Sequence, residues 1–310
     1  MRFDDILDAV GNTPLVGMPR LSPKPSVRLW AKLEGNNPTG SLKDRIAKKM
    51  VEAAEASGEL TPAHVLLEPT SGNTGISLAM VARRKGYRLA VVMPENASQE
   101  RVQLLELFGA QVVFSPADKG TNGSIEVARA MAEDPKYFMP FQYGNENNPL
   151  AHYEGTGEEI VRDLPGVTHF VAGLGTGGTL TGVGRRLKEH NPTVQVIAAE
   201  PELGELVYGL RSLEEGFIPP ILDESVLDRK FLVGSADALR ATRAVVEQEG
   251  IFCGISSGAV VHVGRRIAQA VEEADIVCLL PDGGWKYLST QAWAPEIERA
   301  DKGVEETLWW

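Results

Sequence analysis

The sequence predicts an α/β protein that is built on doubly wound, mostly parallel sheets. Apolar runs of four to six residues alternate with amphipathic helical patterns from residue 29 to the end. Turns rich in glycine, serine and proline follow several of these runs. With 310 residues and 43% hydrophobic content, the chain is long enough for one large or two medium hydrophobic cores.

The first part of the chain contains one helix and then three strand–helix units. A helix begins near Ser41 and Asp44, whose spacing is close to a capping box, and ends at Gly58. Apolar residues recur between these ends at helical spacing. The elements predicted after it are strands 65–68, 89–93 and 111–115, and helices that run from the turn at 69–73 to Gly86, over 98–108 and over 124–132.

A second set of units begins after residues 138–143. Asn191 and Pro192 stop one of its helices, because proline cannot continue a helical hydrogen-bond pattern. No repeat, low-complexity linker or change of composition marks a domain boundary. The elements predicted here are strands 169–172, 194–199 and 276–280, and helices 178–190, 235–249 and 257–274.

The composition restricts the classes of partner. A formal net charge of −11 and a pI near 5.1 argue against nucleic acid and anionic membranes, because both require clustered Lys and Arg. No apolar run reaches 18 residues, and the first residues do not resemble a signal peptide. We therefore expect a cytoplasmic protein. Cys253 and Cys278 lie in apolar runs and predict buried thiols, and the five histidines predict no metal cluster.

Lys43 is the main candidate for catalysis. It follows a Pro/Gly turn and lies in the first turn of a predicted helix. The positive end of the helix dipole disfavours an ammonium there, and burial in a cleft would lower the pKa of Lys43 further. A lysine that is neutral near pH 7 serves as a nucleophile and as a proton shuttle. The alternative is a solvated lysine without a special function.

The glycine-rich run from Gly173 to Thr179 predicts a phosphate site. It follows a strand and opens a helix, so that backbone N–H groups and the helix dipole converge on an anion. The run also fits the dinucleotide-binding pattern, and Glu200 lies 22 residues after Gly178, where an acid would bind a ribose hydroxyl. These residues alone leave a nicotinamide-dependent dehydrogenase open.

Two further turns carry polar groups. The turn from Thr70 to Gly75 joins a strand to a helix and suits an amino-acid carboxylate, because it offers backbone N–H groups and hydroxyls. The alternative is an ordinary capped turn. Ser257 begins a predicted helix, and the alternative for it is a simple N-cap.

The stretch from Asn37 to Arg45, Asn-Pro-x-x-Ser-x-Lys-Asp-Arg, resembles the pyridoxal-phosphate lysine motif of the cysteine synthase family. The resemblance runs from Gly11 to Thr290, about nine-tenths of the chain. It implies a tryptophan synthase β-like fold with two doubly wound, three-layer domains. The smaller domain would span 36–145, and the larger would combine 1–35 with 146–310. It also implies a homodimer.

The resemblance assigns roles residue by residue. Lys43 would hold pyridoxal 5'-phosphate covalently and would remove and return the Cα proton of the substrate. Ser257 would face the pyridine nitrogen, Asn73 would bind the ring hydroxyl, and His152 would pack and hydrogen-bond without catalysing. The cofactor phosphate would be bound by Gly175, Thr176, Gly177, Gly178 and Thr179. The substrate carboxylate would be bound by Thr70, Ser71, Gly72, Thr74 and Gln142.

The implied activity is a β-replacement that makes L-cysteine from an O-activated L-serine. The sulfur donor is open between sulfide, thiosulfate and a thiocarboxylated sulfur-carrier protein. Alternatives are a cystathionine- or siderophore-precursor synthase, a dehydrogenase and a binding module without activity. Arg211 resembles the O-phosphoserine branch, because a phosphate dianion in an acidic protein needs a fixed cation. The alternative for Arg211 is a surface ion pair with Glu214 or Glu215.

The C-terminus ends in two large aromatic residues, Trp309 and Trp310, after a charged segment. Burying each of them would contribute on the order of 2 kcal/mol. We therefore expect them to pack on the mouth of the cleft or at a subunit interface. The alternative is a frayed end.

Overall fold

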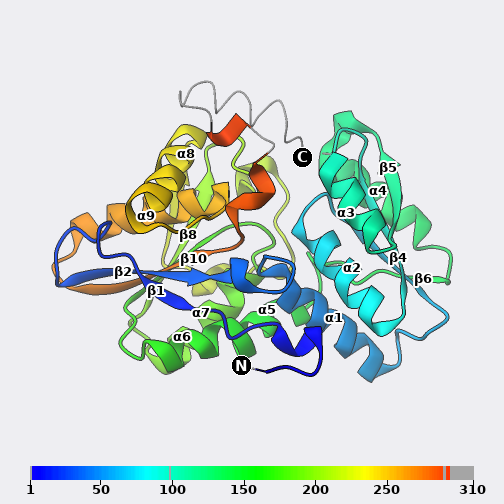
Figure 1. The fold of residues 1–310 in the computed structure, drawn as a ribbon, viewed down its shortest axis with the longest axis horizontal. Coiled ribbons are helices and arrows are strands. Elements are labelled where there is room, and N and C mark those ends of the chain that lie inside the picture. Colours follow the sequence, from blue (N-terminus) through cyan, green and yellow to red (C-terminus); the bar gives the residue numbers. More distant parts are fainter. Residues whose placement is uncertain (1, 98, 289–290, 294–310) are drawn as a thin grey trace.

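The structure, a computed structural model, describes residues 2–97, 99–288 and 291–293. Its strands form two sheets in two lobes (Figure 1). The smaller sheet has the order β5-β4-β3-β6 and is parallel throughout. The larger sheet has the order β1-β2-β10-β7-β8-β9, in which only β1 is antiparallel. The expectation for Trp309 and Trp310 lies outside the described residues.

The smaller sheet is covered by helices on both faces. Helix α4 packs on one face, whereas α2 and α3 pack on the other. The fully buried strand β3 carries the turn that precedes α2. The elements are β3 (Val65–Pro69), α2 (Asn73–Lys85), β4 (Arg88–Pro94), α3 (Gln99–Leu107), β5 (Gln111–Ser115), α4 (Gly120–Met131) and β6 (Tyr137–Phe138).

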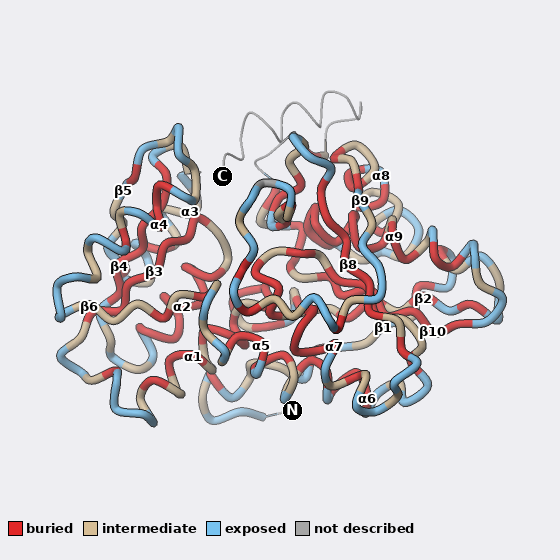
Figure 2. The backbone as a smooth tube through the Cα atoms, turned by 180° about the vertical axis from the view of Figure 1, so that it is seen from behind, coloured by how far each residue is buried: buried red, intermediate tan, exposed pale blue. Residues whose placement is uncertain are grey.

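The larger sheet is also the middle of three layers. Helices α8 and α9 cover one face, and α6 and α7 cover the other. Figure 2 shows that buried residues concentrate in the strands of both sheets. The elements are β1 (Leu15–Gly17), β2 (Val27–Leu33), α5 (Asn147–Ala151), α6 (Glu158–Asp163), β7 (His169–Gly173), α7 (Gly178–His190), β8 (Gln195–Pro201), β9 (Arg229–Val233), α8 (Ser235–Ala244), α9 (Ile255–Ala270) and β10 (Ala274–Leu280).

Helix α1 (Lys43–Ser57) lies between the two sheets and contacts both α2 and α5. Gly58, with a φ of 79°, ends it as predicted. The predicted capping box is wrong, because the Asp44 carboxylate accepts hydrogen bonds from the backbone and hydroxyl of Thr39 instead of capping Ser41. Since α1 packs on both lobes, the division of the chain at residues 36 and 145 stays a prediction.

Most predicted elements are confirmed within a few residues, and three regions differ from the prediction. The predicted helix 257–274 is too long, because Val271 leaves the helical region and Ala274 pairs with Val27 in the sheet. The predicted helix 235–249 continues past Ala244 as a π-helical turn. The helices between residues 147 and 163 were not predicted.

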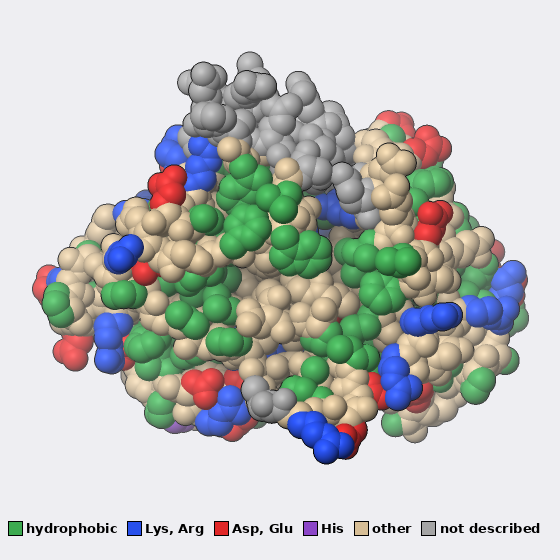
Figure 3. All heavy atoms as spheres, in the orientation of Figure 1, with side chains coloured by type: hydrophobic (Ala, Val, Ile, Leu, Met, Phe, Trp, Pro, Cys, Tyr) green, Lys and Arg blue, Asp and Glu red, His purple; other side chains and the backbone are tan. Residues whose placement is uncertain are grey.

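Three global features bear on the expectations. Cys253 and Cys278 are buried and unpaired, as predicted. No helix in the described part of the chain is long and apolar enough to cross a bilayer. The described residues contain no group of His, Cys, Asp and Glu that could bind a metal ion. In the view of Figure 3, Lys and Arg side chains alternate with Asp and Glu around the edge of the molecule.

Candidate active site

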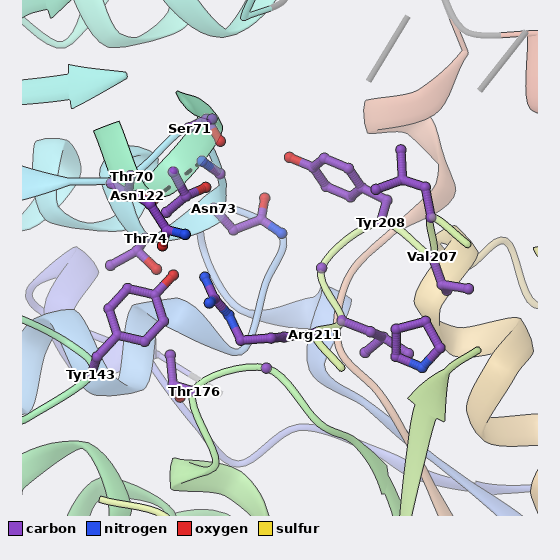
Figure 4. A pocket seen from close by; sticks show the side chains of 18 of the residues that line it. Thr70, Ser71, Asn73, Thr74, Asn122, Tyr143, Thr176, Val207, Tyr208 and Arg211 are labelled. Atoms are coloured by element: carbon purple, nitrogen blue, oxygen red, sulfur yellow. Dashed lines mark hydrogen bonds between the residues drawn. The ribbon is translucent and has the colours of Figure 1, made fainter. Parts of the chain in front are cut away.

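A cavity of about 830 Å³ opens between the two lobes. Its walls come from segments that follow parallel strands, as is usual for ligand sites of open α/β sheets. Figure 4 shows side chains of both lobes pointing into it, among them Thr74, Tyr143, Tyr208 and Arg211. Of the predicted site residues, the cavity is lined by Lys43, Thr70, Ser71, Gly72, Asn73, Thr74, Gln142, Gly175, Thr176 and Arg211.

Lys43 is the first residue of α1 and lines the cavity. Burial lowers the pKa of Lys43 from 10.5 to about 8, although the Asp282 carboxylate opposes this shift. Its side chain makes no hydrogen bond or ion pair with the described residues. An amine in this state is ready to bond to an electrophile and to exchange protons near neutral pH.

The glycine-rich turn has the shape of an anion cradle. Gly177 adopts a φ of 83°, which favours glycine, and a Cβ there would lie 2.8 Å from Leu222. Gly178 then begins α7, so the turn ends at the N-terminus of this helix. Gly175 and Thr176 line the cavity, whereas Gly177, Gly178 and Thr179 are not among its lining residues.

Two buried side chains hold the threonines of this cradle. Asn148 Nδ2 donates to Thr176 Oγ1 at 3.1 Å, and His152 Nε2 lies 3.2 Å from Thr179 Oγ1. Burial, together with the charge of Arg45, holds the pKa of His152 well below its ordinary value, so this ring is neutral. The expectation that His152 packs and hydrogen-bonds is confirmed. Asn148 was not predicted.

Ser257 is fully buried in the first turn of α9. The N-cap of α9 is Gly254, so the alternative that Ser257 only caps the helix is wrong. Its hydroxyl has no hydrogen-bond partner among the described residues. Buried polar groups are rarely left in this state, which indicates that a group outside the chain completes the site.

The turn from Thr70 to Thr74 faces the cavity and leads into α2. Its N-cap residue, Gly72, makes no side-chain cap, so backbone donors of the first turn remain for a ligand. Thr74 Oγ1 donates to Gln142 Oε1 at 2.7 Å and links the turn to the segment after β6. The structure thus brings Gln142 to the turn, as expected.

Asn73 connects the two lobes through residues that were not predicted. Its Nδ2 donates to Asp282 Oδ2 at 2.8 Å, and its Oδ1 accepts from Lys286 Nζ at 2.6 Å. Tyr287 also donates to Asp282 Oδ2, at 2.8 Å. Burial raises the pKa of the Asp282 carboxyl and lowers that of Lys286. The position of Asp282, two residues after a predicted strand, was an available signal for this group.

Arg211 extends its guanidinium into the cavity, beside Tyr143 (Figure 4). The guanidinium carbon lies 5.5 Å from the centroid of the Tyr143 ring and 4.8 Å from that of Phe217. Arg211 forms no ion pair with any described side chain, and Glu214 is exposed. The expected alternative of an Arg211–Glu214 pair is therefore wrong, and the Glu215 side chain lies outside the described part of the structure. Tyr143 was not predicted as a site residue.

Glu200 is not the ribose-binding acid of a dinucleotide site. It is 3% exposed, inside β8, where its carboxylate accepts hydrogen bonds from the Leu213 backbone at 2.5 Å and from Ser212 Oγ at 3.2 Å. Both contacts hold the segment after Arg211. Both hydrogen bonds go to Oε1, so the Glu200 carboxylate is engaged in holding the chain's own loop inside the sheet, which weakens the main support for a dehydrogenase.

Comparison with known proteins gives a consistent family. The pyridoxal-phosphate dependent enzyme family matches residues 6–282. Cysteine synthase B of Salmonella typhimurium is 43% identical over 296 residues, which cover 95% of this chain and 98% of that protein. Cysteine synthase B of Pseudomonas aeruginosa is 40% identical over 296 residues, covering 95% and 99%.

Solved structures agree with this. O-ureido-L-serine synthase has a TM-score of 0.90 at 39% identity, and the match covers 95% of this chain and 96% of that one. Cysteine synthase from Entamoeba histolytica has a TM-score of 0.90 at 34% identity, with coverage of 98% and 96%. The chain belongs to the cysteine synthase family of pyridoxal-phosphate dependent enzymes.

Proposed function

We propose that this protein makes L-cysteine by β-replacement and that it takes O-phospho-L-serine in preference to O-acetyl-L-serine. The observation that carries the substrate choice is Arg211, a cation that points into the cavity and has no ion-pair partner among the described residues. The cysteine synthase B relatives support the product.

The residues of this site fit pyridoxal phosphate. The glycine cradle before α7 suits its phosphate, and the buried, unpartnered hydroxyl of Ser257 suits its pyridine nitrogen. When bound, the cofactor supplies the electron sink that lets a proton leave Cα and a group leave Cβ of an amino acid. A hydroxyl partner, in place of a carboxylate, would leave the ring nitrogen unprotonated and weaken this electron sink, which would favour elimination and addition at Cβ. We assign the ring hydroxyl to Asn73.

Lys43 has two tasks in this proposal. It would hold the cofactor covalently, and its amine would take the Cα proton of the substrate and later return it. A base with a pKa of about 8 is suited to both transfers, because it exists in both protonation states near neutral pH. Burial, the cause of this pKa, also keeps bulk water away from the reacting carbon.

The substrate would lie across the cavity between the two lobes. Its α-carboxylate would be bound by the N-terminal turn of α2 and by the hydroxyls and amide of Thr70, Ser71, Thr74 and Gln142. Arg211, on the opposite wall, would bind the phosphate that leaves from Cβ. A guanidinium matches two phosphate oxygens, and no comparable cation is needed for a neutral acetyl ester.

A second candidate reaction deserves a test, because O-ureido-L-serine synthase is as similar in structure as the cysteine synthases. In that case the same chemistry at Cα and Cβ would serve a nucleophile without sulfur. A cystathionine- or siderophore-precursor synthase also differs only in the nucleophile that adds at Cβ. All of these share the amino-acid half-site, so only the nucleophile distinguishes them.

The experiment is a turnover assay of the purified protein with its cofactor. O-phospho-L-serine and O-acetyl-L-serine are each paired with sulfide, thiosulfate, a thiocarboxylated carrier protein and hydroxyurea. We expect cysteine to form with a higher kcat/KM for O-phospho-L-serine. A higher kcat/KM for O-acetyl-L-serine would reject the substrate choice. Product formation with hydroxyurea alone would reject cysteine synthesis.

A further inference from the structure

A buried carboxylate in the smaller sheet has no role in the reaction as described so far. Glu68 lies on β3, two residues before Thr70, and is 0% exposed. Its two oxygens accept hydrogen bonds from consecutive backbone N–H groups, Phe141 at 2.8 Å and Gln142 at 3.0 Å. One carboxylate therefore joins the strand that leads to the turn at 70–74 with the segment that carries Gln142 and Tyr143.

The segment that Glu68 binds has an unusual backbone. Phe141 adopts a φ of 54°, in the left-handed region that residues with a Cβ rarely occupy. Such a conformation persists only where the surroundings hold it in place. The hydrogen bonds from Phe141 and Gln142 to Glu68 are among the contacts that hold this backbone, together with the bond from the Gly144 N–H to the Phe141 carbonyl.

The same contacts determine which group Gln142 offers to a ligand. Its backbone carbonyl accepts from Asn148 Nδ2 at 2.9 Å, and its side-chain Oε1 accepts from Thr74 Oγ1 at 2.7 Å. Its backbone N–H is bound to Glu68. The side-chain Nε2 has no hydrogen bond to a described residue, and Gln142 lines the cavity. Gln142 thus presents a donor, which a carboxylate needs.

We propose that Glu68 is a positioning residue that holds Gln142 so that its side-chain amide donates to the α-carboxylate of the substrate. This inference rests on the proposed function, since it names the group that orders one half of the substrate site. Two acceptor oxygens on one side chain are required, because the two N–H groups are adjacent and both point at Glu68.

Glutamine at position 68 is the sharpest test, because it keeps the size of the side chain and replaces one acceptor oxygen by a donor. That NH₂ group would oppose one of the two backbone N–H groups. Burial raises the pKa of Glu68 to about 7, so measurements at pH 8 compare the ionised carboxylate with the amide. In Glu68→Gln we expect the KM for O-phospho-L-serine to rise about tenfold or more, with kcat within about threefold.

A double-mutant cycle separates positioning from a general effect on the fold. If Glu68 acts through Gln142, the double variant Glu68→Gln/Gln142→Ala should bind substrate no worse than Gln142→Ala alone. Glu200→Gln is the matched control, because it is also a buried carboxylate that accepts a backbone N–H, but in the other sheet. Its effect should add to that of Gln142→Ala. Additive effects for Glu68 would overturn the proposal.

Amide hydrogen exchange in the cofactor-free protein gives a readout that does not depend on turnover. The amides of Phe141 and Gln142 should exchange at least about tenfold faster in Glu68→Gln, whereas amides of α2 should be unchanged. Unchanged exchange at 141 and 142 would also overturn the proposal. If the glutamine variant does not fold, Glu68→Asp, which keeps both acceptors on a shorter side chain, replaces it in both measurements.

The two proposals fail in different ways. A wild-type protein that converts none of the O-activated serines would reject the proposed function, while the exchange data would still report whether Glu68 holds the segment. A wild-type protein that is active but shows additive effects in the cycle would reject only the role of Glu68.

Discussion

At the residue scale, two of the basic side chains that line the cavity, Lys43 and Arg211, are suited to different tasks. Lys43 is partly desolvated and loses its proton easily, whereas Arg211 stays charged between aromatic rings. A neutral amine suits proton transfer, and a permanent cation suits a phosphate. The assignment of chemistry to Lys43 and of substrate choice to Arg211 follows from this difference.

The pKa of Lys43 is directly measurable in the cofactor-free protein. Because burial lowers it to about 8, the rate of acetylation of Lys43 by acetic anhydride should rise with pH to a midpoint near 8. Lys136 is the control, since its ion pair with Asp134 raises its pKa. Mass spectrometry of peptides would report both lysines at once. A midpoint for Lys43 as high as that of Lys136 would show that Lys43 is solvated.

Removal of the Arg211 side chain should affect one substrate. In Arg211→Ala we expect a loss of roughly 2–3 kcal/mol, on the order of 30- to 200-fold in kcat/KM, for O-phospho-L-serine. O-acetyl-L-serine should be nearly unaffected. Arg211→Lys keeps the charge but not the bidentate geometry. Its kcat/KM for O-phospho-L-serine should therefore lie between those of the wild type and Arg211→Ala. Equal losses for both esters would show that Arg211 has a structural role through its contacts with Tyr143 and Phe217.

Site residues were predictable from sequence where they lie on one turn and unpredictable where two distant segments meet. The turns at 70–74 and 175–179 carry their chemistry in consecutive residues. Glu68 lies within an apolar run, and its partners are 73 and 74 residues away, so no local pattern reveals it. Arg211 could be proposed because an acidic chain needs a cation for a phosphate, but its aromatic neighbours depend on the fold.

At the scale of elements, a buried ionic cluster holds the helix that carries Lys43. Arg45 contacts Glu34 at 2.6 Å and Glu159 at 2.7 Å, and Lys32 contacts Glu159 at 2.6 Å. These residues come from α1, α6, β2 and the end of that strand, and all are buried. The cluster therefore ties the N-terminal end of α1 to the larger sheet.

Neutralising one member of this cluster should destabilise the fold. Glu159→Gln leaves Arg45 and Lys32 partly unpaired in the interior and should cost about 3–5 kcal/mol in the free energy of unfolding. The neighbouring Glu158→Gln, which breaks only the exposed pair with Arg186, should cost less than about 1 kcal/mol. Urea unfolding of both variants measures the difference. Similar values for the two would show that the cluster contributes little.

The cluster also predicts how the stability of the fold changes as the pH falls. Burial alone would raise the pKa of Glu159, but hydrogen bonds and charge from Arg45 and Lys32 lower it to about 2. Since the folded pKa lies below the ordinary 4.5, the stabilisation is present above about pH 4.5 and is lost as the pH falls toward 2. Glu159→Gln should therefore flatten the fall in stability over this range.

Elements with clear local signals in the sequence were predicted, whereas elements whose presence or ends depend on strand pairing were not. Gly58, Gly86 and Gly109 end their helices with positive φ, as predicted. Strand β9, Arg-Lys-Phe-Leu-Val, lies at the edge of the larger sheet and has an apolar run of only three residues. The end of α9 depends on the pairing of Ala274 with Val27, 247 positions earlier, which helical periodicity cannot indicate.

At the scale of the whole molecule, side chains from both lobes meet across the cavity. Asn73, at the start of α2, hydrogen-bonds to Asp282 and Lys286, which follow β10 in the sequence. Arg101 of α3 lies 4.3 Å from the centroid of the Tyr208 ring. Contacts between the lobes thus lie beside the cavity that Lys43 lines. The α/β class was predicted from periodicity, but this meeting of two sheets came only from the family resemblance.

The most direct test of the account is chemical trapping of the cofactor on the protein. The purified protein with bound pyridoxal phosphate should be yellow, and borohydride reduction followed by peptide mass spectrometry should find the phosphopyridoxyl group on Lys43 alone. Lys43→Ala should lose this label and the β-replacement activity together. A label on another lysine, or a label retained in Lys43→Ala, would contradict the account of this site.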